Sequence, residues 1–187
     1  PALVAELGSV TGNARYAAFS DALANARVPA RLSVKDAVDV GRAMNEYHEP
    51  YMRLVAARIT GPLTAAQVNA LAADTQGLNR FKIVTYLGQA GLLRGPFGPA
   101  DIALIVRNME LYRAPTISLL ARVLTPNMGA REVISLFGRM SSPIRLATLS
   151  ELKSAGRLKN PLSAEEVDAI AVTFGMFLEG TARDVLN

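Results

Sequence analysis

The chain has 187 residues, of which 50% are apolar, 19% charged and 6% aromatic, and its formal net charge is +4. This composition is too apolar for a disordered chain, and no run approaches the roughly 20 apolar residues needed to cross a bilayer. Cysteine is absent and His48 is the one histidine, which excludes disulfides, iron–sulfur clusters and multi-histidine metal sites. We therefore expect no catalysis, no cofactor, no metal and no membrane partner.

Apolar residues recur at three- and four-residue steps along the whole chain, which predicts helices and no strands. Pro and Gly punctuate the pattern and divide the expected helices into pairs. The sequence therefore predicts an all-α fold of about six helix–turn–helix hairpins, over residues 1–31, 32–62, 63–96, 97–127, 128–161 and 162–187.

Each hairpin has recognisable start, break and stop signals. First helices open with a cap followed by a side chain that reaches back three residues later. The cap pairs are Ser33 with Asp36, Thr64 with Gln67, and Ser163 with Glu166. A break is expected near residues 75–77 and 141–143. We place Pro50 and Pro115 in the first turn of second helices, and expect those helices to end at the prolines Pro62, Pro96, Pro126 and Pro161.

The hairpins are copies of a longer unit. Segments that start at residues 32, 63, 97, 128 and 162 begin alike, so unit lengths of 31 and 34 residues alternate and the full period is 65. A shift of 65 superposes 42-RAMNEYHEPYMRLVAARIT-60 on 107-RNMELYRAPTISLLARVLT-125 without a gap.

Stacked hairpins can bury faces that a single hairpin cannot, so the repeat predicts one domain over residues 1–187, a right-handed α-solenoid. The expected core includes Leu71, Ile105, Leu136, Ile170, Met44, Met109 and Phe174. The chain begins and ends within a repeat, which indicates either a part of a longer protein or ends covered by partners.

Arginine is the sharpest functional signal, since sixteen of the twenty basic residues are Arg. Arg15, Arg80 and Arg145 stand one period apart near the start of second helices, and Arg42 and Arg107 form a second row. A guanidinium fork suits phosphate, so both rows are candidate nucleic-acid contacts. The alternative for the first row is structural salt bridges, to Asp36, Asp101 or Glu132.

Aromatic residues repeat as well, and they have two interpretations. Tyr47 and Tyr112 are one period apart, with Phe177 in the third copy. They could stack on unpaired bases, or they could belong to the core between hairpins, which is the commoner role. His48 coincides with Arg113 after the shift of 65, so we expect it at a solvent-facing position.

The hairpin pattern L/F-S/T-x-x-D/E-V/I-x-x-I/L resembles the degenerate helical repeats of the octotricopeptide, heptatricopeptide and FAST-kinase-like families. That resemblance implies a superhelix with a basic concave face that binds single-stranded RNA, in mitochondria or another organelle. The segment 63-LTAAQVNALA-72 is also similar to the first helix of a TAL-effector repeat. The alternating unit lengths and unlike loops depart from that family, so no base code is carried over.

Two functions from different classes follow from these patterns. The favoured one is a non-catalytic RNA-binding module in an organellar RNA-processing or ribosome-associated assembly. The other is a protein–protein scaffold, including a secreted bacterial effector or a cytoplasmic protein that grips a protein complex. Steep weakening of binding by salt would distinguish RNA from an apolar protein contact.

Overall fold

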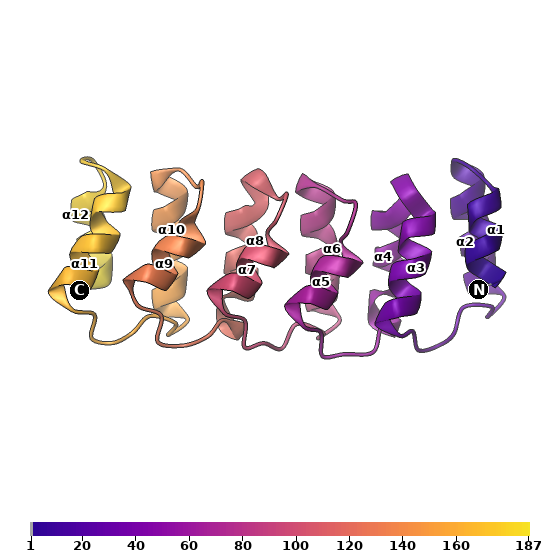
Figure 1. The fold of residues 1–187 in the computed structure, drawn as a ribbon, viewed down its shortest axis with the longest axis horizontal. Helices are drawn as coiled ribbons and strands as arrows, with labels where there is room; N and C mark the ends of the chain where they lie inside the picture. The colour runs from indigo at the N-terminus through magenta and orange to yellow at the C-terminus, as the bar shows by residue number, and fades with distance from the viewer. Residues whose placement is uncertain (1) are drawn as a thin grey trace. The chain divides into compact units, whose positions relative to one another are not determined.

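The computed structural model describes residues 2–187 and is helical throughout, with no β-strand in that range (Figure 1). The prediction of an all-α fold is therefore confirmed. The chain divides into two compact units between Arg94 and Gly95, and each unit holds three helical hairpins.

The first unit contains six α-helices in chain order. They are α1 (Ala2–Ser9), α2 (Asn13–Ala24), α3 (Val34–Met44), α4 (His48–Val55), α5 (Ala65–Leu71) and α6 (Gly77–Gln89). Short 3₁₀ turns, η1 (Asn45–Tyr47) and η2 (Ala56–Arg58), flank α4.

The second unit repeats this plan. Its helices are α7 (Pro99–Ile105), α8 (Arg113–Leu120), α9 (Ala130–Phe137), α10 (Ser142–Ser154), α11 (Ala164–Ala171) and α12 (Glu179–Leu186). The 3₁₀ turns are η3 (Glu110–Tyr112), η4 (Ala121–Val123) and η5 (Val172–Phe174).

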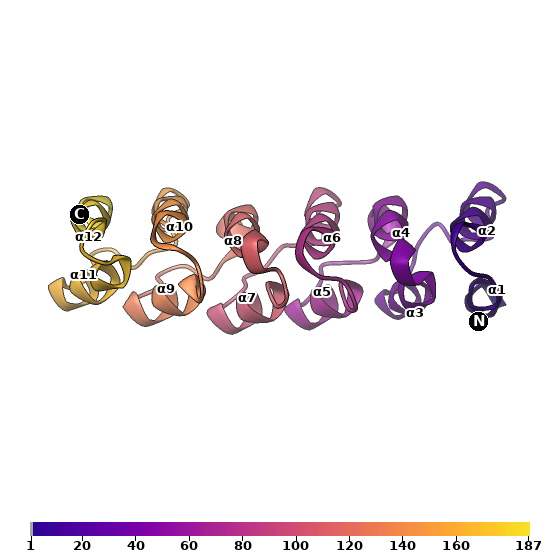
Figure 2. The same cartoon turned by 90° about the horizontal axis from the view of Figure 1, so that it is seen from above.

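Hairpins pack side by side within each unit. In the first unit α3 packs between α1 and α5, and α4 packs on α6. In the second unit α9 packs on α7 and α11, while α10 packs on α8 and α12. Each unit thus has one layer of odd-numbered helices and one of even-numbered helices (Figure 2).

The predicted helix caps are present. Ser33, Thr64 and Ser163 each accept a hydrogen bond from the backbone amide three residues later. The residue three positions on reaches back in the Thr64 and Ser163 boxes. Asp36 instead accepts the Ser33 hydroxyl at 2.6 Å, because its short side chain closes on the cap residue itself. These bonds satisfy amides that no helical carbonyl can reach.

Second helices begin as expected but end earlier. Pro50 and Pro115 lie in the first turn of α4 and α8, where no amide donor is needed. However, α6 ends at Gln89 and α10 at Ser154, six or seven residues before Pro96 and Pro161. The intervening residues are extended instead, because their backbone pairs with the segment that opens the same hairpin.

That pairing is a repeated feature. Isolated parallel bridges join Leu32 to Ile59, Phe97 to Leu124 and Met128 to Leu158. In the hairpin of α7 and α8, the Phe97 amide donates to Val123 O at 2.8 Å and the Thr125 amide donates to Phe97 O at 2.8 Å. The entry and the exit of a hairpin are therefore hydrogen-bonded to each other.

The seven predicted core residues are all buried, with at most 3% of any side chain exposed. Two other expectations are wrong. His48 is 2% exposed, because it lies at the start of α4 against Gly41 of α3. Phe177 is 94% exposed, because it falls in the turn between η5 and α12 rather than on a helix.

Candidate nucleic-acid interface

The first arginine row holds the hairpins together. Each member lies at the start of a second helix and donates to carbonyls at the end of the helix before it. Arg15 bonds Leu7 O and Val10 O, Arg80 bonds Ala72 O at 2.7 Å, and Arg145 bonds Gly138 O and Thr173 O. A cation at the C-terminal end of a helix stabilises the helix dipole, so these contacts are structural.

This arrangement corrects two predictions. Arg80 is 3% exposed, and a buried guanidinium does not reach a phosphate. The proposed salt bridges to Asp36, Asp101 and Glu132 do not form in the part of the chain described. Those acids instead serve the starts of first helices, where Asp101 and Glu132 accept the Gly98 and Gly129 amides at 3.0 and 3.1 Å.

The second arginine row is exposed. Arg42 lies in the last turn of α3, and Arg107 follows the end of α7. Neither guanidinium makes a hydrogen bond or ion pair to another residue among residues 2–187. Their surroundings differ, since only Arg107 borders a groove of the second unit.

The groove has a volume of about 680 Å³ and lies between the hairpin of α7 and α8 and the hairpin of α9 and α10. Three arginines line it, and they come from different elements: Arg107 follows α7, Arg113 begins α8, and Arg139 lies between α9 and α10. The remaining polar lining comes from Asn108, Glu110 and Ser141, and apolar lining includes Leu111, Met140 and Ile144.

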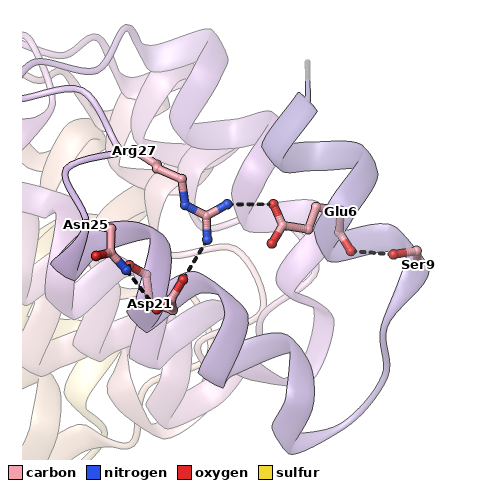
Figure 3. Close-up of polar contacts among 5 residues, drawn as sticks. All are labelled: Glu6, Ser9, Asp21, Asn25 and Arg27. Atoms are coloured by element: carbon pink, nitrogen blue, oxygen red, sulfur yellow. Dashed lines mark hydrogen bonds and ion pairs between the residues drawn. The ribbon is translucent and has the colours of Figure 1, made fainter.

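These three arginines lack partners in the described structure. Other arginines are neutralised locally; Arg27, for example, bridges Glu6 of α1 and Asp21 of α2 at 3.0 and 2.7 Å (Figure 3). Arg107, Arg113 and Arg139 form no hydrogen bond and no ion pair to any residue in the range 2–187. Three unpaired guanidinium groups around one hollow create a strong positive potential there, which favours an anionic ligand.

Backbone geometry fixes one of these arginines. Gly138 has φ +49°, and a Cβ built on it would lie 1.8 Å from Arg113 Nη1. The Arg113 guanidinium therefore rests directly on the Gly138 backbone, in space that only glycine leaves open. The same glycine ends α9 and leads into Arg139, so it positions two of the three cations.

The first unit has different residues at the equivalent positions. A shift of 65 residues places Arg42, His48 and Asp74 where the second unit has Arg107, Arg113 and Arg139. His48 is buried and its Nε2 has no hydrogen-bond partner in the described structure. Burial lowers the pKa of His48, and Arg42 lowers it further, while a backbone hydrogen bond at Leu71 and the charge of Asp74 act in the opposite direction. The first unit therefore carries no comparable cation cluster.

Sequence reasoning found Arg107 but missed Arg113 and Arg139. It looked for residues that stay the same after a shift of 65, and these two arginines replace a histidine and an aspartate. The usable signal was the opposite one: positions where a copy gains positive charge. Because a binding site needs only one copy, departures from the repeat mark it better than the repeat itself.

The predicted stacking tyrosines are half-buried. The Tyr47 ring stacks on Tyr16 with centroids 5.7 Å apart and an interplanar angle of 26°, and its hydroxyl donates to Asn13 Oδ1. Tyr112 directly precedes Arg113, and its carbonyl accepts the Thr116 hydroxyl at 2.7 Å. Tyr47 is thus engaged within its own unit, and Tyr112 lies next to the groove in sequence.

Comparison with known proteins adds no relative: no protein-family model, curated protein or solved structure matches the chain. Among residues 2–187, no helix has the length and apolar character needed to cross a membrane. Over the same range, no cluster of three or more His, Asp or Glu side chains is arranged to hold a metal ion.

Proposed function

We propose that the chain is a non-catalytic helical-repeat module that binds RNA, and that the groove between α7/α8 and α9/α10 is its main contact with the phosphate backbone. The observation that carries this proposal is the convergence of Arg107, Arg113 and Arg139, all without partners in the described residues, on one groove. Phosphate is the anion that arginine forks recognise best, and RNA presents it repeatedly.

The architecture behind this proposal is an α-solenoid built from two-hairpin repeats of 65 residues. Support comes from contacts that recur at that spacing. The bridge of Leu32 to Ile59 has its counterpart in Phe97 to Leu124. The bond of Arg15 to Leu7 O likewise has its counterpart in Arg80 to Ala72 O. An organellar RNA-processing or ribosome-associated setting is the one that the resemblance to octotricopeptide-type repeats implies.

The direct test measures affinity for a fluorescent single-stranded 12-nucleotide RNA across a salt series. The test variant carries Arg107→Gln, Arg113→Gln and Arg139→Gln. Its matched control carries Arg31→Gln, Arg53→Gln and Arg131→Gln, which are also exposed and make no hydrogen bond or ion pair in the described residues. Both variants lose three charges, so a difference between them reports position rather than net charge.

We expect the groove variant to lose at least tenfold in affinity, while the control loses less than threefold. The slope of log K against log salt concentration should flatten by about 2 in the groove variant, since each single-strand phosphate contact contributes about 0.7. Equal losses in the two variants would contradict the assignment of the groove. Absence of RNA binding in the unaltered protein would contradict the function.

A protein–protein scaffold is the second candidate, and a different surface favours it. Val172, Met176 and Phe177 are 60%, 87% and 94% exposed, and they lie within six residues around η5. Exposed apolar residues that cluster in this way mark contact surfaces. If a protein partner is captured, Met176→Ser with Phe177→Ser should abolish that capture and leave RNA affinity unchanged.

A further inference from the structure

Glu110 is an unexpected residue in a groove for anions. It lines the same hollow as the three arginines, is exposed, and forms no ion pair with them or with any other residue in the described part of the chain. A carboxylate at this position repels phosphate and weakens the positive potential that the arginines create. A site for phosphate alone gains nothing from it.

The backbone at Glu110 adds a second observation. Glu110 has φ +44°, in the left-handed region that glycine and asparagine adopt most readily. Its counterpart 65 residues earlier is Asn45, with φ +50°. The same backbone bend thus exists in both units, and the second unit places in it a residue that fits less well. Such residues concentrate at functional sites, where the side chain offsets the strain.

The groove is also too large for a phosphate group by itself. Its volume of about 680 Å³ falls in the range of sites for whole small-molecule ligands, roughly 300–1,000 Å³. Beside the arginines it offers the apolar surfaces of Leu111, Met140 and Ile144, and Leu111 is 79% exposed. Apolar surface next to cations suits the flat face of a base joined to its phosphate.

We propose that the groove binds one nucleotide of a single-stranded RNA and selects guanine, with Glu110 as the base-reading residue and the three arginines on the flanking phosphates. Guanine carries two adjacent donors, N1–H and the N2 amine, which match the two oxygens of a carboxylate. Uracil offers one N–H between two carbonyl oxygens, which a carboxylate repels. Adenine and cytosine offer one amine beside an acceptor nitrogen. This inference rests on the proposed RNA-binding function and names the base it prefers.

The test uses four 9-nucleotide RNAs made of uridine except for a central G, A, C or U. The proteins are the full chain, the variant Glu110→Gln and the control Glu165→Gln. Glu165 is an exposed acid of the same unit that lies outside the groove and has no ion pair in the described residues. We expect the full chain and the control to bind the G-containing RNA at least fivefold more tightly than the all-uridine RNA.

In Glu110→Gln the preference for guanine should fall to within twofold, while affinity for the all-uridine RNA rises because a repulsive charge is gone. Unselective but salt-sensitive RNA binding by the full chain would overturn this inference and leave the proposed function standing. Absence of binding to all four RNAs would overturn both. Competition by free guanosine monophosphate as strong as that by the G-containing RNA would show that the ligand is a free nucleotide, and would overturn the assignment to an RNA strand.

Discussion

At the scale of single residues, a buried arginine separates architecture from binding. Arg80 donates to Ala72 O, and its Nη2 donates to Asn69 Oδ1. Replacement by Met would leave these acceptors buried without their donor, which typically destabilises a fold by about 2–4 kcal/mol. We expect Arg80→Met to lower the free energy of unfolding by that amount in urea titrations. Arg131→Met, at an exposed position, should change it by less than about 0.5 kcal/mol.

His48 predicts a pH dependence at the same scale. Its pKa is lowered in the folded state, chiefly by burial, so the unfolded chain binds a proton that the folded chain does not. The neutral histidine's contribution to stability is therefore fully present above its ordinary pKa of about 6.5 and declines as the pH falls below it. Urea titrations at pH 7.5 and pH 5.5 should show lower stability at the acidic value. This difference should be smaller in His48→Gln, and an unchanged difference would contradict the buried neutral state.

At the scale of elements, the helix caps offer a graded test. Ser163 accepts from the Glu166 amide at 3.2 Å, and Glu166 accepts from the Ser163 amide at 2.9 Å. Ser163→Ala should destabilise the protein by about 1 kcal/mol, because the start of α11 loses its cap. Ser163→Gly should lose only a few tenths, since glycine leaves the amide open to water. Thermal unfolding of both variants would measure the difference, and equal effects would show that the cap does not determine stability here.

Two glycines separate backbone strain from positioning of the arginines. Gly138 and Gly156 have φ +49° and +66°, yet only Gly138 would place a Cβ against Arg113, since nothing lies within 4 Å at Gly156. Alanine at either position should destabilise the fold by about 1 kcal/mol. Only Gly138→Ala should also weaken RNA binding, because it displaces the Arg113 guanidinium. RNA titrations of the two variants decide this, and an equal loss of affinity would assign the effect to strain.

Much of the fold was predictable at these two scales, and the site was not. Apolar spacing and the caps at Thr64 and Ser163 are local signals, and the structure confirms them. The burial of His48 depends on a neighbouring helix that brings Gly41 against it, which no local pattern reports. The groove likewise depends on side chains from three separate elements. Arg107 was found because it repeats, and Arg113 was missed because it does not.

At the scale of the whole molecule, the salt dependence of RNA binding counts the phosphates engaged. A continuous ladder over both arginine rows would engage five arginines, whereas the groove offers three. With about 0.7 per contact, we expect a slope of log K against log salt concentration near −2 for the full chain. A slope steeper than about −3.5, measured between 50 and 200 mM salt, would indicate additional contacts outside the groove.

The backbone pairing that closes each hairpin has a consequence for how such a chain can change length. The Leu32 amide donates to Arg58 O at 2.8 Å, and the Thr60 amide donates to Leu32 O at 2.9 Å. The point where the chain leaves a hairpin is thus within hydrogen-bonding distance of the point where it entered. Excision or duplication of the whole segment between them requires no new linker to span a gap, so genetic recombination can shorten or lengthen the protein by complete hairpins.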